Sequence, residues 1–293
     1  MTQSSPLTGV ILMVAGMAVL PFMDVIAKVL GGAGVPVLQI VWARMAFGAL
    51  LTLPFALQHH GPRGAFPNRP GLHVLRALLL MGATFLFFSA IQTLPIADAL
   101  AIFFVNPLII TALSPLVLGE HVGPRRWAAV GAGFIGTLII IRPGMQAITP
   151  GTIMAFAAGC SVALYFLLTR RIAGASPAMV TTYDTSVMGT AIMSVAMLFF
   201  WQSPSLQTWV LFVALGAIAT LGHLLIVRAY DHGEASLLAP FAYTEMIGAV
   251  AVGWVFFRDF PDRWTFLGVS ILIASAIYIS LRERQRAGPA ARG

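Results

Sequence analysis

Long apolar runs alternate along the chain with short breaks that carry glycine, proline or charged residues. Ten such runs can be counted, and most have the length of about 20 residues with which a helix crosses the hydrocarbon core of a bilayer. The runs cover residues 7–30, 36–57, 72–93, 97–118, 126–142, 150–169, 179–200, 208–228, 235–256 and 264–281. The longest break, 58–71, is too short for a folded domain. The pattern therefore predicts an all-α integral membrane protein with ten transmembrane helices.

The composition supports the same class of protein. Hydrophobic residues make up 59% of the chain and charged residues 9%, whereas a soluble domain is about one quarter charged. The net charge of +7 would suit nucleic acid if the charges formed one basic face, but they lie in the short breaks between apolar runs. The predicted surroundings are therefore a lipid bilayer, with no nucleic-acid partner. The sequence leaves the oligomeric state open and is compatible with a monomer.

The distribution of basic residues predicts the orientation of the helices. With both termini in the cytoplasm, twelve arginines lie on the inner side and four basic residues on the outer side, which matches the excess of Lys and Arg in cytoplasmic loops. The inner set is Arg63, Arg69, Arg76, Arg125, Arg126, Arg170, Arg171, Arg228, Arg282, Arg284, Arg286 and Arg292, and the outer set is Lys28, Arg142, Arg258 and Arg263. We therefore predict a multi-pass protein of a bacterial-type cytoplasmic (inner) membrane with both termini cytoplasmic.

Short matches between the two halves of the chain indicate an internal repeat. The matches are Trp127-Ala-Ala-Val-Gly131 with Trp264-Thr-Phe-Leu-Gly268, and Gly119-Glu120 with Arg258-Asp259. We assign residues 1–143 to the first repeat and residues 144–293, which end in a short basic tail, to the second. Because five helices is an odd number, the second repeat enters the membrane the opposite way up. Such inverted repeats are typical of secondary transporters, whose substrate site lies between the halves near the middle of the membrane.

Several kinds of chemistry lack the residues that they need. The single cysteine, Cys160, lies in an apolar run, so the chain has neither an intrachain disulfide nor a cysteine-based metal site. The single lysine, Lys28, is not preceded by glycine, so there is no phosphate-binding loop for ATP. The acids are too scattered for the catalytic cluster of a membrane enzyme. We therefore predict no enzymatic activity, no cofactor and no metal site.

The chain carries five groups of short motifs in a fixed order. They are Trp42-Ala-Arg44; Asn106-Pro107 with Leu118-Gly-Glu120; Arg126-Trp127 with Ile141-Arg-Pro-Gly144; Leu164-Tyr165 with Thr169-Arg-Arg171; and Ala239-Pro-Phe-Ala-Tyr243. Together they resemble the EamA-type branch of the drug/metabolite transporter superfamily over nearly the whole chain. The resemblance implies ten helices in two EamA repeats and transport of a small organic metabolite. Similar proteins carry amino acids, riboflavin, S-adenosylmethionine or amino-acid-derived metallophores. Arg258-Asp259 departs from the Gly-Glu pair of many members.

The ninth run carries a single ionisable residue, Glu245, near its middle. An acid at that depth is costly in lipid and is expected to face a cavity or a partner. Pro240 would loosen the helix shortly before it, and Tyr243 adds an aromatic ring with a polar tip. We therefore predict that Glu245 and Tyr243 bind the substrate and that Glu245 takes part in proton coupling. Hydrogen bonding between helices is the alternative role for Glu245.

Asn106 corresponds to Glu245 by the repeat and lies in the fourth run, which proline interrupts at Pro107 and again at Ser114-Pro115. A polar residue beside a broken helix in each half is what a binding site near the middle of the membrane requires. Asn106 is therefore a predicted substrate-binding residue.

Asp24 and Lys28 are four residues apart in the first run, so they share one helix face and can form a charge pair. Arg44 lies deep in the second run, and its planar guanidinium suits a carboxylate. We predict that Asp24 and Arg44 bind the substrate and that Asp24 also couples protons. The alternatives are a structural Asp24–Lys28 pair and a permanent pair of Arg44 with Asp24 or Glu245. Trp42 points away from Arg44 on an ideal helix and is expected to face lipid.

The remaining candidates come from the second repeat. Tyr165 corresponds to Asp24 by the repeat, and Asp184, next to Tyr183, corresponds to Arg44. Tyr165 and Tyr183 are predicted to offer flat contacts to the substrate, and Asp184 and His223 are predicted to take part in proton coupling. Packing is the alternative role for His223.

These features predict a secondary-active transporter of a small organic metabolite. An arginine, two acids and several tyrosines suit an amino acid or amino-acid-derived compound, including a metallophore, moved with protons and preferably by export. Alternatives are uptake of riboflavin or S-adenosylmethionine, efflux of a cationic drug, and, from another class, a channel or membrane scaffold.

Overall fold

The structure is a computed structural model that describes residues 6–60, 70–142, 148–173 and 177–287, and this part of the chain is helical throughout apart from short connections. The elements are α1 (Pro6–Gly32), α2 (Val37–His60), α3 (Pro70–Ala90), α4 (Ile96–Phe103), α5 (Val105–Leu118), α6 (Pro124–Ile141), α7 (Pro150–Arg171), α8 (Ala178–Phe200), α9 (Leu206–His232), α10 (Ala235–Leu238), the 3-10 helix η2 (Ala239–Tyr243), α11 (Thr244–Val252), the π-helix η3 (Gly253–Phe257) and α12 (Arg263–Ala287).

These elements form ten transmembrane spans. The fourth span is α4 followed by α5, and the ninth is the succession α10, η2, α11 and η3, while each of the other eight is one helix. Seven spans in the described residues are long and apolar enough to cross a bilayer, and three shorter apolar helices, at 127–140, 241–257 and 263–275, supply the others. The predicted all-α fold of ten membrane helices is confirmed.

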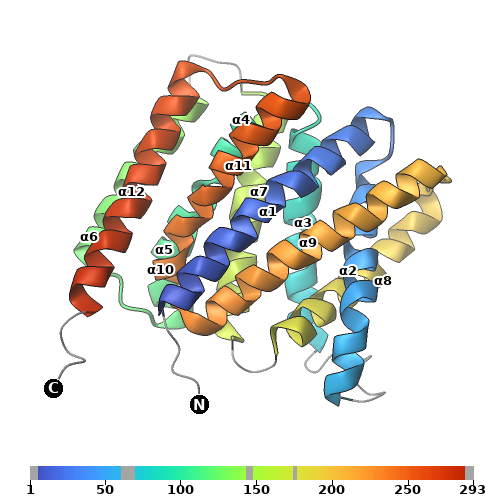
Figure 1. Ribbon diagram of the computed structural model, residues 1–293, viewed down its shortest axis with the longest axis horizontal. Helices are drawn as coiled ribbons and strands as arrows, with labels where there is room; N and C mark the ends of the chain where they lie inside the picture. The colour runs from blue at the N-terminus through green and yellow to red at the C-terminus, as the bar shows by residue number, and fades with distance from the viewer. Residues whose placement is uncertain (1–5, 61–69, 143–147, 174–176, 288–293) are drawn as a thin grey trace.

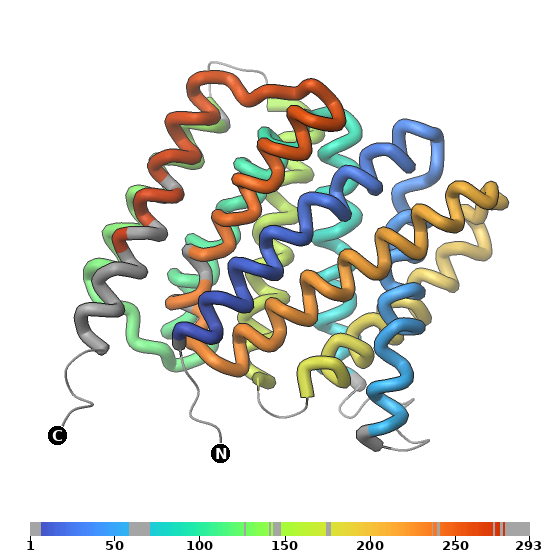
Figure 2. The backbone as a smooth tube through the Cα atoms, viewed as in Figure 1, coloured from blue at the N-terminus to red at the C-terminus, as the bar shows by residue number. Residues whose placement is uncertain are grey.

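The spans pack in pairs that follow the inverted repeat. Spans five and ten (α6 and α12) lie side by side at one edge of the molecule, and spans two and seven (α2 and α8) at the other (Figure 1). Between them α1 packs along α9, and its counterpart α7 packs along α3. Figure 2 shows α1 and α9 side by side, with α3 and α7 behind them. Exchanging the first five spans for the last five leaves this set of pairs unchanged, as a two-fold relation between the repeats requires.

The two faces of the bundle are named here by the chain ends. The N-terminal face is the side where α1 begins and α12 ends, and the opposite face is where α1 ends and α12 begins (Figure 1). The first repeat starts at the N-terminal face, whereas α7, the first helix of the second repeat, starts at the opposite face. The two repeats therefore run through the membrane in opposite directions.

The fourth and ninth spans are interrupted in their first half. The fourth span is interrupted at Phe104, between α4 and α5, and the ninth contains a 3-10 turn at Ala239–Tyr243. Pro240 lies in that turn, as expected. The interruption predicted at Ser114-Pro115 was wrong, because α5 continues through Pro115 to Leu118. Ser114 donates to the Thr111 carbonyl inside the helix at 3.1 Å.

Arg76 and Trp42 lie in other surroundings than the sequence predicted. Arg76, counted among the basic residues of the inner loops, is fully buried in α3. Trp42 was expected to face lipid, but it is half-buried and its indole Nε1 donates to Ser194 Oγ at 3.0 Å. Arg63, Arg69 and Arg292, which also carried the orientation prediction, lie outside the described residues.

Candidate functional site

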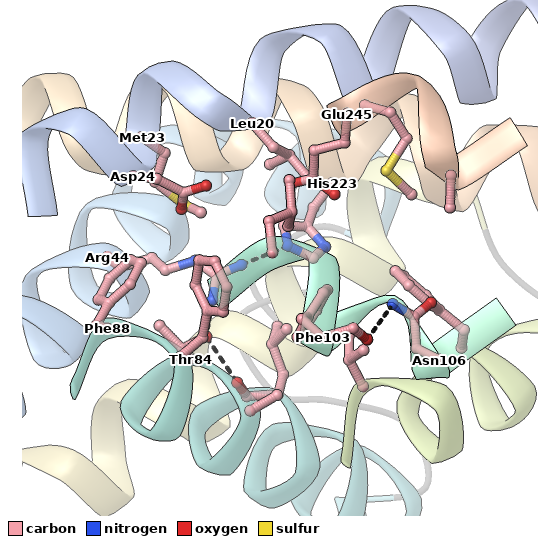
Figure 3. Close-up of a pocket in the computed structure, with 18 residues that line it drawn as sticks. Leu20, Met23, Asp24, Arg44, Thr84, Phe88, Phe103, Asn106, His223 and Glu245 are labelled. Atoms are coloured by element: carbon pink, nitrogen blue, oxygen red, sulfur yellow. Dashed lines mark hydrogen bonds between the residues drawn. The ribbon is translucent and has the colours of Figure 1, made fainter. Parts of the chain in front are cut away.

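A cavity lies between the two repeats, beside both broken spans. Its polar side chains come from six different elements: Asp24 (α1), Arg44 (α2), Thr84 (α3), Asn106 (α5), His223 (α9) and Glu245 (α11). Its apolar wall consists of leucine, methionine, alanine and valine side chains together with four phenylalanines, Phe87, Phe88, Phe103 and Phe166. Figure 3 shows Asp24 and Glu245 on one side of this cavity, with Asn106 and Phe103 on the other. The structure thus gathers four of the predicted substrate-binding residues in one place.

Arg44 is held in position by two neutral partners. Its Nη1 donates to Thr84 Oγ1, and its Nη2 hydrogen-bonds His223 Nε2 (Figure 3). Thr84 in turn donates to the Leu80 carbonyl of its own helix at 2.7 Å. The guanidinium has five N–H donors, so these two contacts leave others for a ligand. Among the described residues no ion pair joins Arg44 to either cavity acid, so a permanent Arg44 pair is not what the structure contains.

The two acids of the cavity come from neighbouring spans. Asp24 is 1% exposed and Glu245 is 6% exposed, and their helices, α1 and α11, pack together. Both carboxylate oxygens of Asp24 are buried without a hydrogen-bond partner among the described residues. A carboxylate in that position needs a proton or a cation to be stable. Asp24 therefore faces the cavity as an open acceptor.

Lys28 does not pair with Asp24. Its Nζ forms an ion pair with Asp259 Oδ2 at 3.2 Å and donates to the Leu94 carbonyl at 3.1 Å. It also lies 4.9 Å from the centroid of the Phe257 ring, a cation–π distance. The predicted Asp24–Lys28 pair was wrong, because Lys28 lies near the end of α1 and reaches groups at the opposite face instead.

Asn106 marks the break in the fourth span. Its Nδ2 donates to the Phe103 carbonyl at 3.0 Å, which satisfies a backbone acceptor that the break leaves free (Figure 3). Its Oδ1 is buried without a partner among the described residues. The same side chain thus holds the broken helix and offers an acceptor to the cavity.

A second cavity lies next to the first. Arg44, Leu80 and His223 line both and separate them. Its other polar side chains are hydroxyls, from Tyr165, Thr182, Thr185, Ser186 and Thr220. The predicted residue Tyr165 therefore belongs to the second cavity.

The two other predicted tyrosines, Tyr183 and Tyr243, do not line the first cavity. Tyr183 packs against Ala49 and Ala56 and lines neither of the two cavities. Tyr243 packs edge-on against Phe104, with ring centroids 5.2 Å apart, and its hydroxyl is buried without a partner among the described residues. Of the aromatic side chains, the first cavity is lined by phenylalanines, while the predicted contacts of the tyrosines to a substrate stay a prediction. Phenylalanine recurs throughout the apolar runs, so the sequence did not single out the ones that line the cavity.

Asp184 belongs to a buried group near the N-terminal face that the sequence did not predict. Its Oδ2 pairs with His73 Nε2 at 3.4 Å, and His73 Nδ1 lies 3.4 Å from Arg76 Nη1. Arg76 also donates to Thr169 Oγ1 at 3.1 Å and lies 5.2 Å from the centroid of the Tyr165 ring. We call His73, Arg76, Tyr165, Thr169 and Asp184 the charged cluster. Arg76 lies four residues inside its predicted span, so its depth was the one available signal.

Comparison with known proteins places the chain among membrane transporters. An S-adenosylmethionine uptake transporter of Rickettsia bellii is 26% identical over 263 residues, which cover 89% of both chains. A riboflavin transporter of Vibrio cholerae is 28% identical over 257 residues, 86% of both chains. The pseudopaline exporter CntI of Pseudomonas aeruginosa is 28% identical over 290 residues, 94% of this chain and 97% of that one.

A crystal structure of another protein has the same fold. It superposes with a TM-score of 0.73 at 20% identity and covers 96% of this chain and 99% of its own. The EamA-like transporter family matches residues 7–142 and again residues 149–281. The predicted class, a small-metabolite transporter and not an enzyme, is confirmed at this level. The chain is a multi-pass membrane protein that belongs to the EamA-like transporter family.

Proposed function

We propose that the chain is a secondary-active, proton-coupled carrier of an amino acid or an amino-acid-derived compound, which binds in the first cavity. The observation that carries the proposal is the placement of a guanidinium and two carboxylates around one cavity, those of Arg44, Asp24 and Glu245. An amino acid has a carboxylate for the first and an ammonium group for the others. Arg44 suits a carboxylate because its planar fork can make two parallel hydrogen bonds.

The charges of the cavity supply a means of coupling. Arg44 contributes one positive charge, and Asp24 and Glu245 together contribute two negative charges when both are ionised. The cavity then has an excess of negative charge, which a proton or a cationic solute group neutralises. Because a buried charge must be compensated, protons and solute cations compete for the same acids. Such competition lets a proton gradient drive solute movement.

The relatives support this class of solute. S-Adenosylmethionine is an amino-acid derivative with a net positive charge, and it is named as the solute of the Rickettsia relatives. Its carboxylate and its cationic groups fit the charges described above, and its ring system fits the phenylalanine wall. Free methionine lacks the ring and is the smaller member of the same class.

Substitution of Arg44 tests the assignment of the solute. In proteoliposome counterflow, Arg44→Lys and Arg44→Ala should lower exchange of a carboxylate-bearing solute by about tenfold to a hundredfold, the effect of losing a hydrogen bond to a charged group. Exchange of a lipophilic cation without a carboxylate is the control and should stay nearly unchanged. Unaltered exchange of methionine and S-adenosylmethionine in both variants would show that Arg44 only holds helices together.

Substitution of the acids tests the coupling. Glu245→Gln keeps the shape of the side chain and removes its charge, so it should abolish proton-driven accumulation and spare exchange at equal concentrations. Asp24→Asn is the matched variant on the neighbouring helix. Proton-driven accumulation that survives both changes contradicts coupling through these two acids.

Riboflavin is the second candidate solute. The phenylalanine wall favours it, since a flat ring system stacks on aromatic side chains, and riboflavin transporters are among the relatives. Riboflavin has no carboxylate, so its transport should be nearly insensitive to Arg44→Lys. The same counterflow assay therefore separates the two solutes.

The proposal also includes the inner membrane as location, the cytoplasm for both termini, and export as direction. Ser203 and Gln58 are exposed at opposite ends of the bundle. In a Cys160→Ser background, an impermeant thiol reagent added outside should label Ser203→Cys and miss Gln58→Cys. The reverse result overturns the orientation.

The direction of transport needs a separate measurement, because an inverted repeat favours neither export nor uptake. Solute levels inside and outside cells with and without the gene decide between the two.

A further inference from the structure

Two ion pairs occupy corresponding positions at opposite faces of the molecule. Lys28 at the end of α1 pairs with Asp259, which follows the ninth span, at 3.2 Å. Arg170 at the end of α7 pairs through Nε with Glu120, which follows the fourth span, at 3.4 Å. Since α7 is the repeat counterpart of α1, and the fourth span that of the ninth, the inverted repeat relates the two pairs. We call them the Lys28 pair and the Arg170 pair.

The correspondence extends to a third span in each case. Lys28 Nζ also donates to the carbonyl of Leu94, just after α3, at 3.1 Å. Arg170 Nη1 donates to the carbonyl of Tyr230, near the end of α9, at 2.6 Å. The ends of α3 and α9 are again counterparts in the two repeats. Each basic residue therefore joins three spans at one face. The inverted repeat relates the three spans that Lys28 joins to the three that Arg170 joins.

Each pair is built on the two spans that carry one wall of the first cavity. Lys28 lies one turn beyond Asp24 in α1, and Asp259 follows the span that contains Glu245. Arg170 lies on α7, which contributes Phe166 to the cavity. Glu120 follows α5, at whose beginning Asn106 lies, so that pair serves the opposite wall. Each wall is thus fastened at a different face of the membrane.

The two pairs are suited to repeated opening. The side chains of Lys28 and Asp259 are 18% and 34% exposed, and those of Arg170 and Glu120 are 26% and 8% exposed. At the water boundary an ion pair is cheap to break, because its groups are rehydrated when they part. Each pair has at least one partly exposed partner, although the side chain of Glu120 is itself buried. Asp259 follows the π-helical turn Gly253–Phe257, a local departure from α-helix that is often found at functional sites.

We infer that the Lys28 pair closes the cavity toward the opposite face, that the Arg170 pair closes it toward the N-terminal face, and that each pair parts when the cavity opens on its own side. This inference rests on the proposed carrier function. In the present structure both pairs are formed.

The test measures how fast a cysteine in the cavity is labelled from each side. Ala83 lines the cavity, and Ala83→Cys in a Cys160→Ser background is the reporter. Right-side-out and inverted vesicles expose the two faces to an impermeant maleimide. Asp259→Asn should raise labelling from the opposite face and lower it from the N-terminal face, and Arg170→Gln should do the reverse. The expected change is about two- to fivefold, as for a partly exposed ion pair.

A third ion pair supplies the matched control. Arg142 Nη2 and Asp262 Oδ2 lie 2.6 Å apart at the opposite face, but they join α6 to α12, neither of which lines the first cavity. Asp262→Asn should therefore leave labelling from both faces unchanged. The double exchange Lys28→Asp with Asp259→Lys should return the labelling ratio toward that of the parent, which would attribute the shift to loss of the pair and not to the loss of one side chain.

The result that overturns the inference is a change of the same sign from both faces, no change at all, or an equal change in Asp262→Asn. Labelling does not require a known solute, so it is separable from the proposed function. Opposite shifts in labelling without counterflow of any tested solute would contradict the proposed substrate and keep the inference. Counterflow of a tested solute with unshifted labelling would contradict the inference and keep the proposed function.

Discussion

The two faces of the bundle carry side-chain clusters of different chemistry at corresponding places of the two repeats. At the opposite face, Trp42, Phe47, Trp201 and Trp209 pack together, with ring centroids 5.1 Å apart for Trp42–Trp201 and 6.1 Å apart for Trp201–Trp209. We call these four residues the aromatic cluster. At the N-terminal face the charged cluster around Arg76 takes the equivalent place, where α3, α7 and α8 approach one another.

The difference shows that the two repeats share the packing of their helices but stabilise it with different side-chain interactions. Ring contacts depend on shape and tolerate any aromatic residue of suitable size. The charged cluster depends on each partner, because a buried guanidinium or carboxylate that loses its partner is left uncompensated. The charged cluster is therefore expected to be the more sensitive of the two to substitution.

The largest effect is expected from Arg76→Met. This change removes the fully buried guanidinium that contacts His73, Thr169 and Tyr165, and it leaves Asp184 with His73 as its partner and without a nearby guanidinium. The free energy of unfolding should fall by about 3 kcal/mol, as when one partner of a buried ionic network is removed. Thermal unfolding of the purified protein in detergent measures it. Arg76→Lys restores the charge without the fork and should recover only part of the loss.

A smaller effect is expected from Trp209→Ala in the aromatic cluster. Trp209 contacts Trp201, Phe47 and Phe212, the last with ring centroids 5.8 Å apart. Because lipid replaces much of the lost apolar contact, only the ring interactions are lost, about 1–2 kcal/mol. Trp209→Phe should cost less than half of this in the same unfolding assay. If Trp209→Ala destabilises the protein more than Arg76→Met, the comparison of the two clusters is contradicted.

The smallest effect has the opposite sign and concerns the ends of the two broken spans. Gly119 after α5 and Arg258 after η3 are counterparts, and both have left-handed backbone, with φ of 69° and 59°. A side chain is strained in that conformation, so Arg258→Gly should stabilise the protein by about 0.5–1 kcal/mol. Gly119→Ala is the reciprocal change and should destabilise it by a similar amount. Equal melting temperatures for parent and Arg258→Gly would show that the exposed turn relaxes.

Local pattern determined the membrane spans, the break in the ninth span and the depth of the main ionisable residues. A run of about 20 apolar residues has few alternatives to a transmembrane helix, because every backbone polar group must be satisfied inside the bilayer. Proline has no backbone N–H to donate, so an irregular helix around Pro240 followed from the sequence. Burial of Asp24, Arg44 and Glu245 followed from their positions within spans, since charged groups avoid lipid.

Only the tertiary structure decided which of these residues meet. Lys28 pairs with Asp259, 231 residues away, and not with Asp24 on its own helix. Tyr183 and Tyr243 turned away from the first cavity, and Phe87, Phe88 and Phe103 supplied its aromatic wall. The physical reason is that membrane helices are apolar on every side, facing either lipid or other helices. Their sequences therefore carry little of the periodicity that tells which side of a helix is buried, and the rotation of each helix is set by packing against its neighbours.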